Sequence, residues 1–232
     1  DGRTQTGICA CASIEDYQNG IIKKHENTRA EKEQDRIRHV DTCNAQTGPI
    51  FLAYRANEQI GQAVEACMKN APLYDRKRED GTRHTVWLMD APEQIEAVQK
   101  AFATIQNIYI ADGHHRCASA VKVGLKRASE NPNDTGKEPY HYFLSVLFPD
   151  RDLMIMDYNR IVKDLNGLSE EEFLKQIEKA FLVTKAGEKD CPADYRKPDQ
   201  KGEFGLYLNS GWYRLQIRPE FKNSDPVEGL DV

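Results

Sequence analysis

The sequence lacks several features that quickly place a protein in a class. No apolar run approaches the roughly 18 residues of a transmembrane helix, and the first residues do not resemble a signal peptide. The 37 Asp and Glu residues outnumber the 32 Lys and Arg residues, and the net charge of -5 argues against a nucleic-acid binder that works through bulk electrostatics. We therefore expect a cytoplasmic protein without a membrane or nucleic-acid partner, while the oligomeric state stays open.

The cysteines also lack a pattern. The 6 cysteines are scattered, no C-x-x-C pair occurs, and a chain of 232 residues can bury a core without disulfides. The sequence therefore predicts neither a structural zinc site nor a disulfide framework. Cys9 and Cys11 alternate on a predicted strand and so face one side, where we expect free, buried thiols.

The length allows one large domain or two small ones. The pattern changes after Pro149, and we predict a larger domain at 1–149 and a smaller α+β portion at 150–232, with a single domain as the alternative. The chain begins at Asp1 rather than at a methionine, and both ends read as ordinary globular sequence. We therefore expect an internal fragment of a longer protein.

Hydrophobic periodicity and turn residues predict an α/β (α+β) fold with a mixed sheet and flanking helices. The expected strands are 7–16, 49–54, 84–89, 108–112, 142–148, 153–158, 204–208 and 212–217. The expected helices are 27–39, 58–69, 92–102, 117–127 and 170–181. Ser169 and Glu172 predict a capping box at the start of the last helix, and Asn209-Ser210-Gly211 predicts a hairpin turn.

The most informative stretch is residues 107–119, Asn-Ile-Tyr-Ile-Ala-Asp-Gly-His-His-Arg-Cys-Ala-Ser. An apolar strand ends at Asp112, Gly113 breaks it, and a helical pattern follows. A helix that begins there directs its free N–H groups and the positive end of its dipole beyond the strand. Two imidazoles, a guanidinium and a carboxylate at this junction predict an anion site with a neighbouring base, which suits phosphate chemistry.

In this interpretation Gly113, His114, His115 and Arg116 contact phosphate. Asp112 either accepts a proton from a hydroxyl group or holds Mg²⁺. The alternative is structural: Asp112 is a helix N-cap, and both histidines are exposed polar residues on the first turn. The density of functional side chains at one strand-to-helix junction favours the first interpretation.

A second charged stretch runs from Lys23 to Arg36. Its interleaved cations and carboxylates are typical of a solvated helix surface. His25 and Glu26 lie just before this helix, where both can reach a ligand or a magnesium ion, and Lys32 and Arg36 are further candidate contacts. A metal site that combines His25, His114, His115 and a carboxylate is a weaker alternative, because adjacent histidines usually diverge and the spacing matches no standard zinc motif.

These stretches carry a family resemblance. Ile21 to Arg29, Lys32-Glu33-x-Asp35-Arg36, Tyr109 to Arg116 and Asp157 to Val162 resemble, in this order, a widespread prokaryotic family catalogued as a domain of unknown function. The Asp-Gly-His-His-Arg string is also similar to the phosphate-binding motif of the ParB/sulfiredoxin superfamily, and specifically of the free L-serine kinases.

The second resemblance implies a ParB/sulfiredoxin-like core, with Asp112 as base, Glu26 as an upstream catalytic glutamate, and residues 113–116 as nucleotide phosphate contacts. The implied reaction is phosphoryl transfer from ATP or ADP, with Mg²⁺, to a small hydroxyl metabolite. Free L-serine is the best candidate for that substrate. A non-catalytic nucleotide-binding switch of the ParB type and a metal-dependent hydrolase stay open as alternatives.

Overall fold

The computed structural model describes residues 2–188, 191, 194–224 and 229. The chain divides into two compact units, 1–154 and 155–232. In the described part of the chain, every helix is too short or too polar to cross a membrane.

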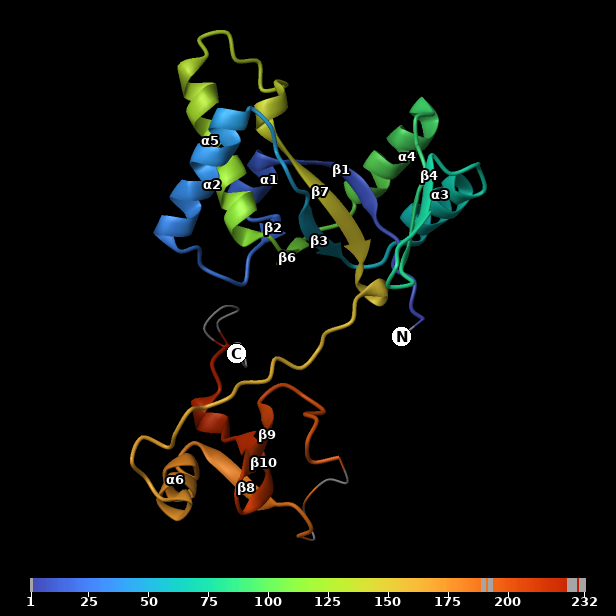
Figure 1. Ribbon diagram of the computed structural model, residues 1–232. Coiled ribbons are helices and arrows are strands. Elements are labelled where there is room, and N and C mark those ends of the chain that lie inside the picture. Colours follow the sequence, from blue (N-terminus) through green and yellow to red (C-terminus); the bar gives the residue numbers. More distant parts are fainter. Residues whose placement is uncertain (1, 189–190, 192–193, 225–228, 230–232) are drawn as a thin grey trace. The chain divides into compact units, whose positions relative to one another are not determined.

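The first unit is built around a mixed sheet of five strands (Figure 1). Their order in space is β1 (Ile8–Ser13), β7 (Tyr142–Pro149), β3 (Ile50–Tyr54), β6 (Ile108–Asp112) and β2 (Ile22–Lys23). β1 runs antiparallel to β7 and β3 antiparallel to β6, whereas the pairs β3–β7 and β2–β6 are parallel. The mixed sheet predicted from the sequence is confirmed.

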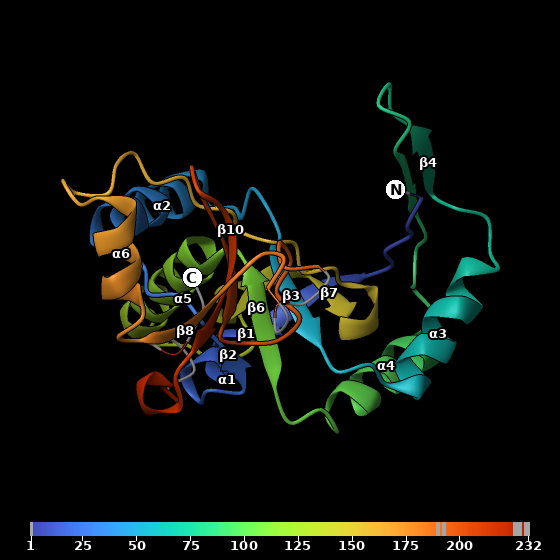
Figure 2. The same cartoon turned by 90° about the horizontal axis from the view of Figure 1, so that it is seen from below.

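Five helices accompany this sheet: α1 (Ile14–Gln18), α2 (Ala30–Cys43), α3 (Glu58–Met68), α4 (Pro92–Phe102) and α5 (His114–Glu130). Alternate residues of the central strands point into the core, where Leu52, Ile110 and Phe143 are fully buried. Cys117 and Val121 of α5 pack against them. Figures 1 and 2 both show α2 alongside α5, in contact along its length. A hairpin of β4 (Tyr74–Lys77) and β5 (Arg83–Val86) follows α3.

In its described residues, the second unit contains a three-stranded antiparallel sheet and one α-helix. The strand order is β8 (Phe181–Lys185), β10 (Gly211–Ile217) and β9 (Glu203–Leu208), and the helix is α6 (Glu170–Ile177). Leu208, Tyr213 and Leu215 form the buried centre of this unit. The capping box between Ser169 and Glu172 is confirmed, and β9 and β10 form the predicted hairpin.

Several sequence predictions of local structure need correction. The strand predicted at 7–16 ends at Ser13, because the Ser13 hydroxyl accepts a hydrogen bond from the Glu15 N–H (3.1 Å) and starts α1. Cys9 and Cys11 are free but exposed, because β1 is an edge strand and the core-facing residues of β1 are the alternate ones, such as Ala12. The helix predicted from residue 117 begins three residues earlier, at His114.

Two further corrections concern the segments around the second unit. The helix that follows Ser169 ends at Ile177, and Phe181 instead begins β8, paired with Ile217. The strand predicted at 153–158 is wrong, because this segment has no regular structure. Met154 and Ile155 are 54% and 96% exposed, and consecutive apolar side chains cannot all face one side of a strand.

Helix α5 approaches a neighbouring backbone closely at Gly124. A Cβ atom there would lie 2.2 Å from the carbonyl oxygen of Tyr140, in the 3-10 turn Pro139–His141 before β7. Neither backbone can yield without moving a whole element, so this approach requires glycine. Gly61 of α3 differs, because a Cβ atom there would meet Nη2 of Arg151 at 3.4 Å, an ordinary contact distance.

We predict opposite effects of alanine at these two helical glycines. Gly61→Ala should raise the free energy of unfolding by about 0.5–1 kcal/mol, because alanine has the higher helix propensity. Gly124→Ala gains the same propensity term but forces a backbone clash that costs more, with a net loss of about 1–3 kcal/mol. Urea unfolding followed by circular dichroism measures both. Equal effects of the two substitutions would contradict the close approach at Gly124.

Candidate functional site

The candidate site begins where β6 gives way to α5. Asp112 is the last residue of β6, and Gly113 adopts a left-handed backbone (φ 93°) as the N-cap of α5. A Cβ atom on Gly113 would also lie 3.1 Å from Nε and Nη2 of Arg116. Glycine therefore serves two purposes here, since it permits the reversal of the chain and leaves room for the guanidinium.

A cavity of about 680 Å³ opens at this junction. One wall is formed by residues 112–116. The other is formed by Glu26 and by five residues of α2: Glu31, Lys32, Asp35, Arg36 and Arg38. The two charged stretches, more than seventy residues apart in the sequence, thus meet at one cavity. Of the candidate site residues only His25 is not part of the lining, and its ring instead contacts the ring of His114 edge-on, with centroids 4.4 Å apart.

The imidazole of His114 is almost completely buried, with a side chain 4% exposed. Its Nε2 accepts a hydrogen bond from the backbone N–H of His25 (3.4 Å), and its Nδ1 lies 3.5 Å from a carboxylate oxygen of Glu26. Burial lowers the pKa of His114 below its ordinary value, the neighbouring His25 lowers it further, and Glu26 opposes both. His114 is therefore a neutral imidazole at physiological pH.

His115, the next residue of α5, also accepts a backbone hydrogen bond through its ring. Its Nε2 accepts a hydrogen bond from the backbone N–H of Arg29 (3.1 Å), and its carbonyl oxygen accepts one from the hydroxyl of Ser119 (2.6 Å). Both adjacent histidines thus turn Nε2 toward the segment 25–29, although adjacent histidines on a helix usually diverge. Only Nδ1 of each ring is left to face another group.

Arg116 and Asp112 form an ion pair across the first turn of α5. Nη2 of Arg116 lies 2.9 Å from Oδ2 of Asp112, and Nη1 donates to the carbonyl oxygen of Pro49 (2.8 Å). Both side chains stay on the cavity wall, and that of Asp112 is 73% exposed. An exposed ion pair contributes little to stability. The guanidinium of Arg116 can therefore turn to a bound anion at a small cost in free energy.

The α2 wall carries charges of both signs. Asp35 lies between Arg36 (3.3 Å) and Arg38 (3.8 Å) in exposed ion pairs. Lys32 also lines the cavity, and its ammonium has no ion pair or hydrogen bond within the described part of the chain. Lys32 is therefore the cation at this cavity that is most available to an incoming anion.

Comparison with known proteins adds one assignment. A family model described as Protein of unknown function (DUF1015) matches residues 1–232. The chain belongs to this family. No curated protein and no solved structure matches it. The family of unknown function expected from the sequence motifs is thus confirmed, and DUF1015 membership by itself assigns no reaction to the cavity.

Sequence patterns alone assign no role to one important residue of this DUF1015 chain, Glu33. The interleaved charges of residues 23–36 favour an exposed position for Glu33, yet its side chain is only 7% exposed. Its carboxylate accepts a hydrogen bond from Thr28 Oγ1 (2.5 Å) and pairs with the ammonium of Lys122, which lowers the pKa of Glu33. The available signal was helical spacing, because the half-buried Ile37 and Val40 follow Glu33 by four and seven positions and so share its face.

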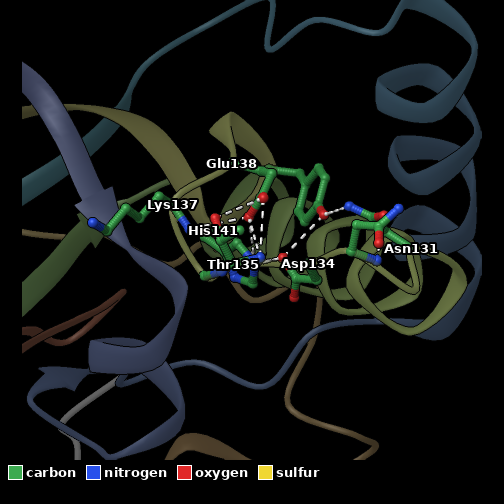
Figure 3. Close-up of polar contacts among 9 residues, drawn as sticks. Asn131, Asp134, Thr135, Lys137, Glu138 and His141 are labelled. Carbon is green, nitrogen blue, oxygen red and sulfur yellow. Dashed lines mark hydrogen bonds and ion pairs between the residues drawn. The ribbon is translucent and has the colours of Figure 1, made fainter.

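A second polar cluster lies in the loop between α5 and β7 (Figure 3). Among the described residues, Asp134, Glu138 and His141 are the three that place potential metal-ligand atoms within 4.8 Å of one another. His141 Nε2 lies 2.7 Å from Asp134 Oδ1, and Glu138 accepts the backbone N–H groups of Thr135 and Lys137, both at 3.0 Å. These hydrogen bonds close the loop by themselves, which gives the cluster a structural explanation.

We predict that His114 makes the stability of the protein depend on pH. Because its pKa is lower in the folded state than the ordinary 6.5, the unfolded state takes up the proton first. The free energy of unfolding should therefore fall as the pH drops below about 6.5, until the folded pKa is reached. Histidine NMR titration and urea unfolding above and below this pH measure both effects.

The matched variants are His114→Asn and His39→Asn, because His39 is an exposed histidine of α2. The difference between the free energies of unfolding measured above and below about pH 6.5 should become smaller in His114→Asn. In His39→Asn this difference should stay close to that of the wild type. A His114 resonance that titrates at or above 6.5 would show that the ring is not desolvated as described.

Proposed function

We propose that the cavity transfers a phosphoryl group from a nucleotide to a small hydroxyl compound, with free L-serine as the best candidate for the acceptor. The observation that carries this proposal is the meeting of the two charged stretches at one cavity beside the N-terminus of α5. The similarity of residues 112–116 to the motif of the free L-serine kinases supplies the reaction class, together with the relation to the ParB/sulfiredoxin superfamily.

The phosphate groups of the nucleotide would lie against the first turn of α5. The backbone N–H groups there have no intrahelical acceptor, and the helix dipole favours an anion. Gly113 lets phosphate oxygens approach the backbone, Arg116 offers a planar fork of donors, and Lys32 offers a free ammonium. These groups would stabilise the charge that develops on the transferring phosphoryl group.

Asp112 would act as the base. Its Oδ2 is bound to Arg116, while Oδ1 is free to accept the proton of the substrate hydroxyl as that oxygen attacks the terminal phosphorus. The bond from phosphorus to the bridging oxygen then breaks, and the shortened nucleotide leaves. Glu26 in the cavity lining is also a suitable ligand for Mg²⁺, which binds carboxylate and phosphate oxygens together and neutralises phosphate charge when present.

The mixed charges of the cavity also support an amino acid as the acceptor. Glu26 and Glu31 offer carboxylates to an α-ammonium group, and Arg36 and Arg38 offer guanidinium groups to an α-carboxylate. A zwitterion can form ion-paired hydrogen bonds with groups of both signs at once, whereas a neutral alcohol can form none of them.

The direct test is incubation of the protein with Mg²⁺, ATP or ADP, and a panel of hydroxyl amino acids, followed by ³¹P NMR. We expect phosphoserine to form. Nucleotide binding without any phosphorylated product, unchanged by Asp112→Asn, would favour the nucleotide-binding switch. Release of inorganic phosphate without an acceptor would favour a hydrolase.

We predict that Asp112→Asn separates binding from turnover. The amide keeps the shape of the side chain but cannot accept the proton, so the turnover rate should fall by about 10²–10⁴-fold while nucleotide affinity changes little. Isothermal titration with the nucleotide and product formation under saturating substrate measure the two quantities. Turnover at the wild-type rate in this variant would remove Asp112 from the reaction.

We predict that Lys32→Ala acts mainly on nucleotide binding. Loss of one charged contact to phosphate should raise the dissociation constant for the nucleotide by about tenfold, equivalent to about 1.4 kcal/mol. The control is Lys100→Ala on α4, where the lysine pairs with Glu96 on the outer surface, and this variant should bind as the wild type does. Equal affinities of the two variants would show that Lys32 does not contact the phosphates.

A further inference from the structure

The strongest unexplained feature of the first unit is the buried carboxylate of Glu33. It lies on α2 at the contact with α5 and takes one partner from each side: the hydroxyl of Thr28, in the segment before α2, and the ammonium of Lys122, on α5. A buried carboxylate costs free energy unless such partners satisfy it. Glu33 therefore ties the segment 25–29 to both helices.

The same segment supplies the hydrogen bonds that hold the two histidines. The N–H of Arg29, next to Thr28, donates to Nε2 of His115, and the N–H of His25 donates to Nε2 of His114. Displacement of Thr28 from Glu33 would release the segment from α5, and both of these amide donors would move with it.

A backbone N–H group can only donate a hydrogen bond, so each Nε2 must accept it with a lone pair. In the neutral ring the proton then resides on Nδ1, which is the less common tautomer of histidine in water. For His114 this places the Nδ1–H toward Glu26, at 3.5 Å from its carboxylate. The protonation of the two rings and the orientation of Glu26 thus depend on where the segment 25–29 lies.

We propose that Glu33 is a positioning residue, which holds the segment 25–29 against α5 and thereby keeps His114 and His115 in the Nδ1–H tautomer. In that state His114 fixes Glu26 at the cavity, and His115 has only its Nδ1–H to offer a ligand. The consequence for turnover rests on the proposed function, whereas the tautomers follow from the geometry alone.

Nitrogen-15 NMR of the histidine rings tests the proposal, because the chemical shifts of Nδ1 and Nε2 distinguish the two tautomers. The spectra are recorded well above the titration range of histidine. In the wild type, Nε2 of His114 and of His115 should both give the shift of an unprotonated nitrogen. If both rings carry the proton on Nε2, the proposal is overturned.

Two variants weaken the anchor, which consists of the contacts of Glu33 with Thr28 and Lys122, in different ways. Glu33→Gln keeps the volume and loses the charge that pairs with Lys122, and Thr28→Val removes the hydroxyl while preserving the shape. Both should move the rings toward a mixture of tautomers. The matched controls are Glu130→Gln at the exposed end of α5 and Thr42→Val on the exposed face of α2, which should leave the ring spectra unchanged. Wild-type tautomers in both anchor variants would refute the role of Glu33.

The kinetic readout is separate from the spectra. If the phosphoryl transfer is correct, Glu33→Gln should lower the turnover rate by about tenfold or more with a smaller change in KM, as for loss of an oriented catalytic group. Absence of turnover in every form of the protein, together with the expected ring spectra, would reject the proposed function and keep the positioning role. Should Glu33→Gln fail to fold, Thr28→Val and the wild-type spectrum still decide the outcome.

Discussion

The junction between β6 and α5 is the constraint on which the site depends. The chain must leave a buried strand and enter a helix within one residue, and the left-handed backbone of Gly113 makes this reversal possible. The buried side chain of Ile110 anchors the strand, and Cys117 anchors the first turn of the helix. Residues 112–116 are therefore held by the core on both sides while their polar groups face a cavity.

The second requirement is the close contact of α2 with α5. It brings the residues around Glu26 and Lys32 to the β6–α5 junction, and it is maintained by polar as well as apolar groups. Glu33 lies buried between the helices, and farther along Asp41 accepts hydrogen bonds from Lys126 and Arg127 of α5. The packing of two helices thus creates a charged cavity at one end, in a chain whose family membership alone assigns no chemistry.

Much of the fold could be predicted from local pattern. Apolar runs predict β3 and β7. The sequence also predicts α4 with the bounds that the structure has, because Pro92 and the apolar stripe define this helix. The spacing of Ser169 and Glu172 likewise predicts the capping box that the structure contains. The predictions are wrong where long-range contacts determine the local structure. Phe181 continues a helical pattern but pairs with Ile217 in a sheet. The exposure of Cys9 depends on which strand lies at the edge of the sheet.

Local sequence pattern is enough to predict the class of the fold and the chemical groups of the candidate site, since the Asp-Gly-His-His-Arg string needs only a strand, a glycine and a helix to take shape. How these groups are used depends on contacts between distant segments. Tertiary contacts place Glu26 beside His114, direct Arg116 toward the carbonyl oxygen of Pro49, and bury Glu33. The physical reason is that hydrogen bonds and burial depend on distances between segments far apart in the chain, and local periodicity carries no information about those distances.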